Sequence, residues 1–258
     1  MLVTSYSLLI FVTGISASAS RTDSSIHLPA TAAPTGAHIL WPMLKAYRMT
    51  RERRCLETAR RAFRAYVDRD LDRVICSAGA IDADTIDKES GLPLLLAALD
   101  LYELTGRKEY LRDAEMAGYY LSTWQWHYTV PYHPDSPILQ LGYDTFGGTS
   151  ITVMAQAQDP WGELIAVGWM RLAAATKQDI WRDRAVQCLN QGSIGVSDGS
   201  LVLKGAKRPA GGQNEGYSFS LRTNDEKRLY GDFNTWLVAW PSAHRLITLM
   251  HWPKWQDF

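Results

Sequence analysis

The sequence is poor in cysteine: three occur in 258 residues, at Cys55, Cys76 and Cys188. They lie far apart and form no Cys-x-x-Cys pair, so the spacing indicates neither a metal site nor a redox pair, and we expect free thiols. An excess of charge of one sign is also absent, because Lys plus Arg and Asp plus Glu both number 27. Nucleic-acid binding depends on a basic surface, so we expect no nucleic-acid partner.

Long apolar runs are missing as well. No apolar stretch approaches the roughly 20 residues that cross a bilayer, so the sequence predicts no membrane span. Residues 1–20 contain a short apolar run followed by small residues, which resembles a secretory signal, although no Lys or Arg precedes the run. Residues 1–28 are therefore either a signal peptide of a secreted or periplasmic protein, or an irregular N-terminal segment of a cytoplasmic one.

Several nucleotide and nucleophile motifs are absent. The sequence has no Gly-x-Ser-x-Gly, Walker or dinucleotide-binding fingerprint, which argues against α/β-hydrolase, NTPase and Rossmann functions. His127 and His133 have no partner at metal-ligand spacing. We therefore expect neither a metal nor an organic cofactor.

Aromatic residues are plentiful, with ten Trp and twelve Tyr. Many of them are expected in the core, but such rings also stack on the flat apolar faces of sugars.

A weak internal repeat organises residues 29–258. Three segments align on Thr50, Thr105 and Thr176, each with a helical apolar pattern before the Thr and a short charged turn after it. A Cys or aromatic residue follows five positions later and an Ala nine positions later: Cys55, Tyr110 and Trp181, and Ala59, Ala114 and Ala185. The pattern predicts an all-α fold of helical hairpins.

The two helices of each hairpin differ in character. Residues 92–101 have almost no polar stripe, which predicts an inner helix buried nearly all round, whereas residues 109–124 are amphipathic and predict an outer helix. A fourth inner helix is predicted over residues 232–250, with Asp232 as its N-cap. Turns within hairpins are short and connections between hairpins are long, so the long loops are expected at one end of the scaffold, where binding groups usually lie.

This arrangement of inner and outer helices resembles the (α/α)6 toroid of the six-hairpin glycosidase superfamily, over roughly residues 36–250. The resemblance implies a substrate cleft at the N-terminal ends of the inner helices. Six hairpins would exceed the length of this chain, which holds about three and a half. We therefore expect an incomplete toroid or a fragment, with an oligomer as a consequence if the toroid is incomplete.

Glycoside hydrolysis commonly uses two carboxyl groups on either side of the scissile bond. The loop before residue 91 offers Lys88 and Glu89, which suit sugar hydroxyls or a sugar carboxylate, with helix capping as the alternative. The loop 141–163 offers Tyr143 and Asp144 at its start and Asp159 and Trp161 at its end. Asp159 also fits an N-cap, and a capping Asp stays ionised, so Asp144 is the preferred catalytic candidate.

The third long loop holds Arg208, Gln213, Asn214 and Glu215 around a Gly pair. Planar amides and carboxylates suit vicinal hydroxyls, and Gly lets the backbone approach a ligand; a polar surface hairpin is the alternative. Glu215 is the predicted second catalytic carboxylate. Trp126, at the end of an outer helix, is a stacking candidate, with packing between hairpins as its alternative.

The leading hypothesis is a carbohydrate-active enzyme that hydrolyses glycosidic bonds of oligo- or polysaccharides, including glycans with uronic acids, through Asp144 and Glu215. A polysaccharide lyase on the same fold is one alternative, in which Tyr143 or His127 acts as base beside Asn214. A non-catalytic glycan-binding or inactive truncated toroid is the other.

Overall fold

A computed structural model describes residues 34–74, 76, 86–151, 157–218, 231–233 and 237–251. All of them belong to one unit, Ala32–Phe258. The expected N-terminal segment, residues 1–28, lies outside the described residues.

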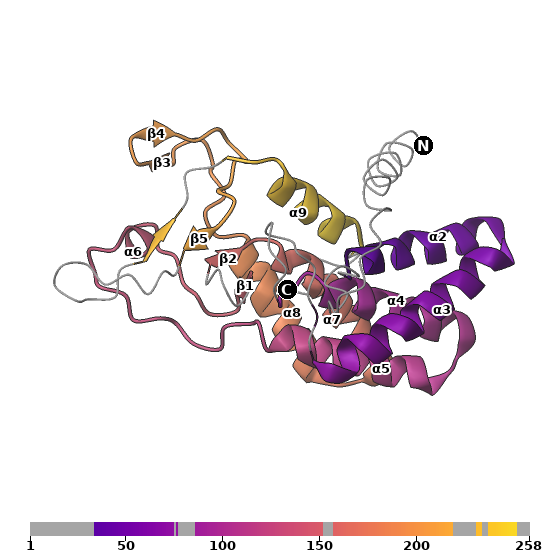
Figure 1. Cartoon of the computed structure of the whole chain (residues 1–258). Coiled ribbons are helices and arrows are strands. Elements are labelled where there is room, and N and C mark those ends of the chain that lie inside the picture. Colours follow the sequence, from indigo (N-terminus) through magenta and orange to yellow (C-terminus); the bar gives the residue numbers. More distant parts are fainter. Residues whose placement is uncertain are drawn as a thin grey trace, which may run out of the picture. The chain divides into compact units, whose positions relative to one another are not determined.

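Three helical hairpins form the body of this unit (Figure 1). Their bounds are α2 (Leu40–Thr50) with α3 (Arg53–Arg69), α4 (Gly91–Thr105) with α5 (Lys108–Ser122), and α7 (Gly162–Thr176) with α8 (Asp179–Gly192). A further helix, α9 (Trp240–His251), packs on α7. Shorter helical turns are η1 (Pro34–Ile39), η2 (Leu71–Arg73) and α6 (Pro137–Gln140). The described residues are thus mostly helical, as predicted.

The repeated threonines mark three turns of the same geometry. In each, the Thr hydroxyl donates to the carbonyl oxygen four residues earlier, at 2.7–2.8 Å. The next residue takes a left-handed backbone conformation and the one after it is extended. The left-handed positions are Arg51, Gly106 and Lys177. The sequence repeat therefore encodes a two-residue turn that reverses the chain between paired helices.

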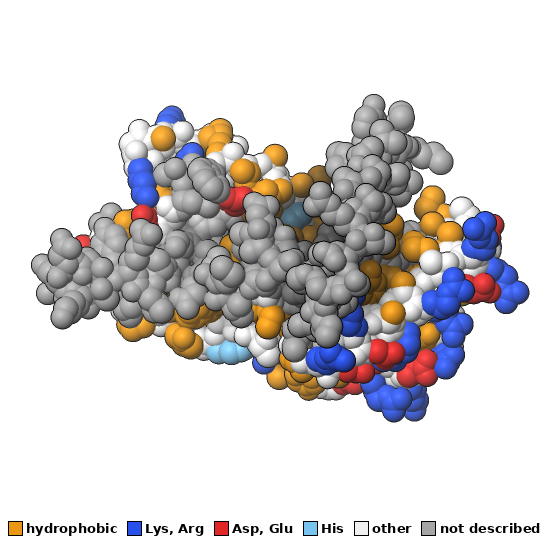
Figure 2. All heavy atoms as spheres, in the orientation of Figure 1, with side chains coloured by type: hydrophobic (Ala, Val, Ile, Leu, Met, Phe, Trp, Pro, Cys, Tyr) orange, Lys and Arg blue, Asp and Glu red, His pale blue; other side chains and the backbone are white. Residues whose placement is uncertain are grey.

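The helices form an inner and an outer row. The inner row is α2, α4, α7 and α9 in that order, because α4 contacts α2 and α7, and α7 contacts α9. Every residue from Gly91 to Leu101 is buried, which confirms the predicted inner helix. The outer helix α3 buries one stripe, Ala59, Phe63 and Val67, and its other faces are the charged surface seen at the right of Figure 2.

An ion network joins three inner helices near the hairpin turns. Asp100 on α4 is 1% exposed and accepts from the guanidinium groups of Arg171 on α7, at 2.6 Å, and Arg48 on α2, at 3.5 Å. Glu103 contacts the same two guanidiniums at 2.7 Å. Asp100 and Arg171 occupy equal places in the repeat, five residues before the Thr, so the repeat also places complementary charges on neighbouring helices.

Two small antiparallel sheets, which the sequence did not predict, lie in the long connections. One has the strand order β1 (Thr149–Ser150), β2 (Ala157–Asp159), β5 (Tyr217–Ser218) and β6 (Asp232–Phe233). The other pairs β3 (Val202–Leu203) with β4 (Ala206–Lys207). The larger sheet joins connections that are distant in the sequence, and Figure 1 shows it away from the α2–α3 turn.

The prediction that Asp232 caps the fourth inner helix is wrong. Asp232 lies in β6, forms an ion pair with Lys204, and accepts the backbone N–H of Phe233. The helix begins at Trp240. Pairing with β5 holds residue 232 in an extended conformation, which overrides the local capping preference.

Candidate functional site

The site is built where the amino-terminal ends of α4 and α7 meet. Lys88, in the turn before α4, is fully buried and reaches the segment before α7. Its ammonium forms an ion pair with Asp159 and lies 3.5 Å from the carbonyl oxygen of Thr149. Its backbone N–H donates to the carbonyl oxygen of Ile151 at 3.3 Å. Two loops in which the sequence predicted site residues are therefore joined by one buried side chain.

Asp159 ends β2 and faces the start of α7. Its carboxylate accepts the backbone N–H of Trp161 at 3.1 Å in addition to the Lys88 contact. Burial raises the pKa of Asp159, while the charge and hydrogen bond of Lys88 oppose that shift. Asp159 thus holds the turn before α7 and also neutralises Lys88, but it is not the N-cap that the sequence suggested, because the helix begins at Gly162 and its N-cap position is Trp161. The Trp161 ring is nearly buried, with its centroid 5.8 Å from the Lys88 ammonium.

The start of α7 needs a residue without a side chain. A Cβ at Gly162 would lie 2.6 Å from the Cys188 sulfur and 2.8 Å from Thr149 Oγ1. The glycine of the Asp-Pro-Trp-Gly-Glu stretch therefore permits close contact of α7 with α8 and β1.

Glu89 precedes α4 and remains partly exposed. The capping contacts at this helix start belong to Asp87, which accepts the backbone N–H of Ser90 at 3.0 Å and its hydroxyl at 2.8 Å. Burial raises the pKa of Glu89 to about 7; Lys88 lowers it, while Asp159 and Asp87 raise it. Within the described part of the chain, Glu89 has neither a hydrogen bond nor an ion pair from its side chain. Helix capping therefore does not explain Glu89.

The third predicted loop reaches the same region through α9. The Trp240 indole N–H donates to a Glu215 carboxylate oxygen at 3.4 Å. The His244 ring lies 5.1 Å from the Trp240 ring and 6.2 Å from the Trp161 ring, between centroids. Burial, together with the charge of Lys88, lowers the pKa of His244 to about 4, so the imidazole is neutral near pH 7. A row of rings thus links Glu215 to the start of α7.

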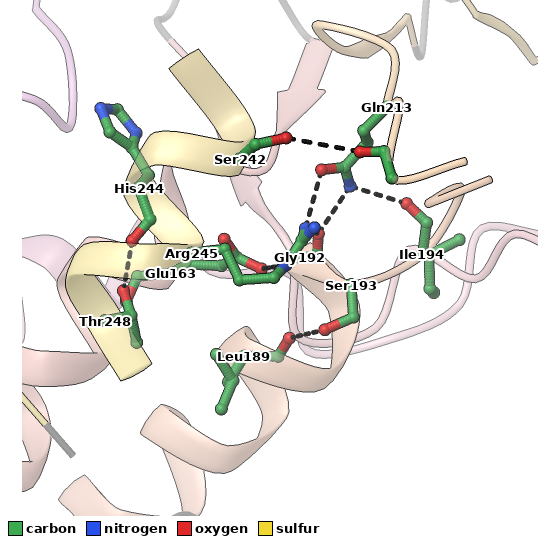
Figure 3. Close-up of polar contacts among 11 residues, drawn as sticks. Glu163, Leu189, Gly192, Ser193, Ile194, Gln213, Ser242, His244, Arg245 and Thr248 are labelled. Atoms are coloured by element: carbon green, nitrogen blue, oxygen red, sulfur yellow. Dashed lines mark hydrogen bonds and ion pairs between the residues drawn. The ribbon is translucent and has the colours of Figure 1, made fainter. Parts of the chain in front are cut away.

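Arg245 fixes α9 in this position (Figure 3). Its guanidinium contacts a carboxylate oxygen of Glu163 at 3.0 Å, the side-chain oxygen of Gln213 at 2.7 Å and the carbonyl oxygen of Gly192 at 3.0 Å. The Gln213 amide donates to Gly192 and Ile194 carbonyl oxygens. Burial raises the pKa of Glu163 to about 7 against the opposing charge of Arg245. Gln213, predicted to bind substrate, therefore lies buried in the network that holds α9.

The structure places Asp144 in a different environment. Its exposed carboxylate accepts the Thr129 hydroxyl at 2.5 Å and the backbone N–H of Phe146 at 2.9 Å, which is the contact of an Asx-turn. Tyr143 beside it is buried, with its hydroxyl 2.9 Å from the side-chain oxygen of Gln158 and in contact with the Gln191 amide. These contacts give Asp144 and Tyr143 structural roles in the loop.

The remaining predicted residues also have identifiable neighbours. Trp126 donates its indole N–H to the Ser150 hydroxyl at 2.6 Å and packs edge-on against Tyr128. Asn214 is 1% exposed and pairs with Leu237 through an isolated β-bridge. Arg208 is 8% exposed. It borders a shallow surface depression of about 390 Å³, which is also lined by Gly199, Lys207, Pro209 and Ala210. None of these described contacts joins Trp126 or Arg208 to the Lys88–Asp159 pair.

Sequence reasoning missed the hydrogen bonds from Ser90, the N-cap residue of α4, to Asp87, and it missed the α9 side chains Trp240, His244 and Arg245. An Asp three residues before a Ser can accept hydrogen bonds from the Ser backbone N–H and hydroxyl, so the sequence did contain a local signal for the contacts of Asp87. The α9 residues gave no local signal, because their role depends on how α9 packs on α7.

Among the described residues, no group of three or more His, Cys, Asp or Glu could hold a metal ion. No helix in the described ranges is long and apolar enough to cross a membrane. No protein-family model and no curated protein matches the chain.

Proposed function

We propose that this protein is a carbohydrate-active enzyme that hydrolyses glycosidic bonds at the amino-terminal ends of α4 and α7, on an incomplete (α/α)6 toroid. The observation that supports the proposal is the series of contacts that runs from Lys88 through the rings of Trp161, His244 and Trp240 to Glu215, and so joins three separate connections. Glu89 comes from the turn before α4, Trp161 from the turn before α7, and Glu215 with Trp240 from the last connection and α9.

The two carboxyl groups of the reaction are Glu89 and Glu215 in this proposal. Glycoside hydrolysis needs one protonated and one ionised carboxyl group. Glu215 keeps the role expected from the sequence. Glu89 replaces Asp144, because the Asp144 carboxylate already accepts two hydrogen bonds that hold its own loop. Trp240, which remains partly exposed, provides apolar ring surface for a sugar.

A panel of oligosaccharides, neutral and uronic-acid-containing, tests this function. The wild-type protein is expected to release new reducing ends without forming an unsaturated uronate. Glu89→Gln and Glu215→Gln should each lower the rate by at least about 100-fold, the lower range of a general acid or base contribution. Glu57→Gln, on the exposed face of α3, is the matched control and should retain full activity.

Other outcomes assign the protein differently. Release of an unsaturated uronate would establish a polysaccharide lyase. Saturable glycan binding without any product, retained in both variants, would establish a binding module.

A further inference from the structure

Helix α9 lies across the candidate site. Its first residue, Trp240, contacts the last connection. In its second half, the Thr248 hydroxyl donates to the carbonyl oxygen of Glu163, in the first turn of α7, at 3.1 Å. Its last residue, His251, has its ring centroid 5.8 Å from that of Trp41, near the start of α2. The helix therefore reaches from the last connection, over the first turn of α7, to α2.

Apolar burial holds α9 in place only weakly. The buried residues of this helix are Pro241 and Thr248, whereas α4 is buried from Gly91 to Leu101. Large apolar side chains of α9 are exposed instead: Leu246 by 60%, Leu249 by 43% and Met250 by 74%. Because burial of apolar surface is the main force that fixes a helix on its neighbours, α9 is fixed less firmly than α4.

The contacts that dock α9 are largely polar and centre on Arg245 (Figure 3). Its guanidinium contacts Glu163 in α7, Gly192 at the end of α8 and Gln213 in the last connection. The Arg245 side chain is 20% exposed, so water reaches it and can replace these acceptors when the helix leaves. A helix that is held mainly by exchangeable polar contacts can open locally at a cost below that of global unfolding.

The contact surface between α7 and α9 also contains polar atoms without partners. Glu163 Oε2 and His244 Nδ1 are buried, and neither has a hydrogen-bond partner in the part of the chain that the structure describes. The other oxygen of the Glu163 carboxyl group contacts Arg245, and the His244 ring packs edge-on against Trp161. A buried polar atom without a partner raises the free energy of the docked state, and water satisfies it once α9 leaves.

We propose that α9 is a lid, which undocks from α7 as one unit to admit a ligand to the site and docks again through Arg245. Opening removes the His244 ring from the Trp161 ring, which is 9% exposed when the lid is closed. The inference concerns access to the site and does not depend on the reaction that takes place there.

Thiol labelling compares the opening of α9 with unfolding of the whole domain. Thr248 is fully buried against Glu163, so Thr248→Cys places a thiol beneath the lid. Cys188 on α8 is 1% exposed and is the reference thiol in the same molecule, while Cys55, which is partly exposed, is replaced by Ser. With iodoacetamide under native conditions, position 248 should react at least about 100-fold faster than Cys188. Equal rates would overturn the inference, because α9 would then leave α7 only on global unfolding.

Two further substitutions separate local opening from global unfolding. Asp100→Asn breaks the ion network near the hairpin turns and destabilises the open and closed forms alike. It should therefore speed the labelling of Cys188 at least about tenfold and leave position 248 unchanged. Arg245→Leu destabilises only the closed form, so it should speed position 248 at least about tenfold. Acceleration of position 248 by Asp100→Asn to the same extent as Cys188 would contradict a lid.

Hydrogen exchange of the wild-type protein keeps the test independent of any substitution. The backbone amides of α9 should exchange as a group, at least about 100-fold faster than those of α4 but still slower than in an unfolded chain. Amides of α9 as protected as those of α4, or not protected at all, would overturn the inference. Neither experiment uses turnover, whereas the proposed function fails only in the oligosaccharide assay, so the two failures are distinguishable.

Discussion

Substitution of Asp100 should destabilise the fold more than any change of the same size nearby. Asp100→Asn keeps the side-chain volume, so no cavity term enters, but it removes the charge that faces two guanidinium groups. Breaking a buried ion pair typically costs about 3–5 kcal/mol of unfolding free energy. Arg48 and Arg171 still contact Glu103, and their side chains are 34% and 24% exposed. Hydration of the two guanidinium groups therefore offsets part of the lost free energy. We expect a loss of about 2–3 kcal/mol.

Glu103→Gln is the matched control. It removes a charge from the same two guanidiniums, but Glu103 is 46% exposed, so the loss should not exceed about 1 kcal/mol. Urea unfolding at pH 7, followed by circular dichroism, measures both. An Asp100→Asn loss equal to that of Glu103→Gln would refute the idea that burial makes this network a structural centre of the inner row.

Three other perturbations have defined outcomes. Gly106→Ala should cost about 1 kcal/mol of unfolding free energy, because no atom within 4 Å would obstruct the new Cβ and only the left-handed backbone opposes it; Lys177→Gly should change stability in the opposite direction. Glu89→Gln should stabilise the protein by about 1–2 kcal/mol at pH 8 and by nothing near pH 4, because the raised pKa makes the wild type lose stability as pH rises from the ordinary value of 4.5 through about 7; equal values at both pH would contradict this. Arg245→Leu should cost about 2–4 kcal/mol at pH 8, because it leaves Glu163 buried without a cation, and less at pH 5, where Glu163 is protonated; urea unfolding at the two pH values should show a smaller loss in acid.

The helical part of the fold could be predicted because its signals are local. Apolar residues at spacings of three and four fix which face of a helix is buried, and the Thr before each turn makes its hydrogen bond within its own helix. The short strands could not be predicted, because two or three residues are too few to show an alternating pattern. Asp232 illustrates the result: it fits a helix start locally but pairs in a strand with distant residues.

The candidate site could be predicted only in outline. Lys88, Asp159 and Trp161 are together, as expected for residues at the starts of neighbouring inner helices. The sequence favours Asp144 because of its carboxyl chemistry. An Asp side chain also readily accepts the backbone N–H two residues later, which forms an Asx-turn, and Asp144 does so with Phe146. The Glu89 carboxyl group is left without a hydrogen bond because Asp87 accepts those of Ser90. Which of the two acids does so is fixed by the folded geometry rather than by residue type.

The most direct test of the account compares two substrates that differ in their leaving group. The wild-type protein should hydrolyse both a natural oligosaccharide and its aryl glycoside analogue. Glu89→Gln should lose at least about 100-fold on the oligosaccharide, which needs protonation to leave, and far less on the aryl glycoside, which does not. An equal loss on both substrates, or none on either, would contradict the account.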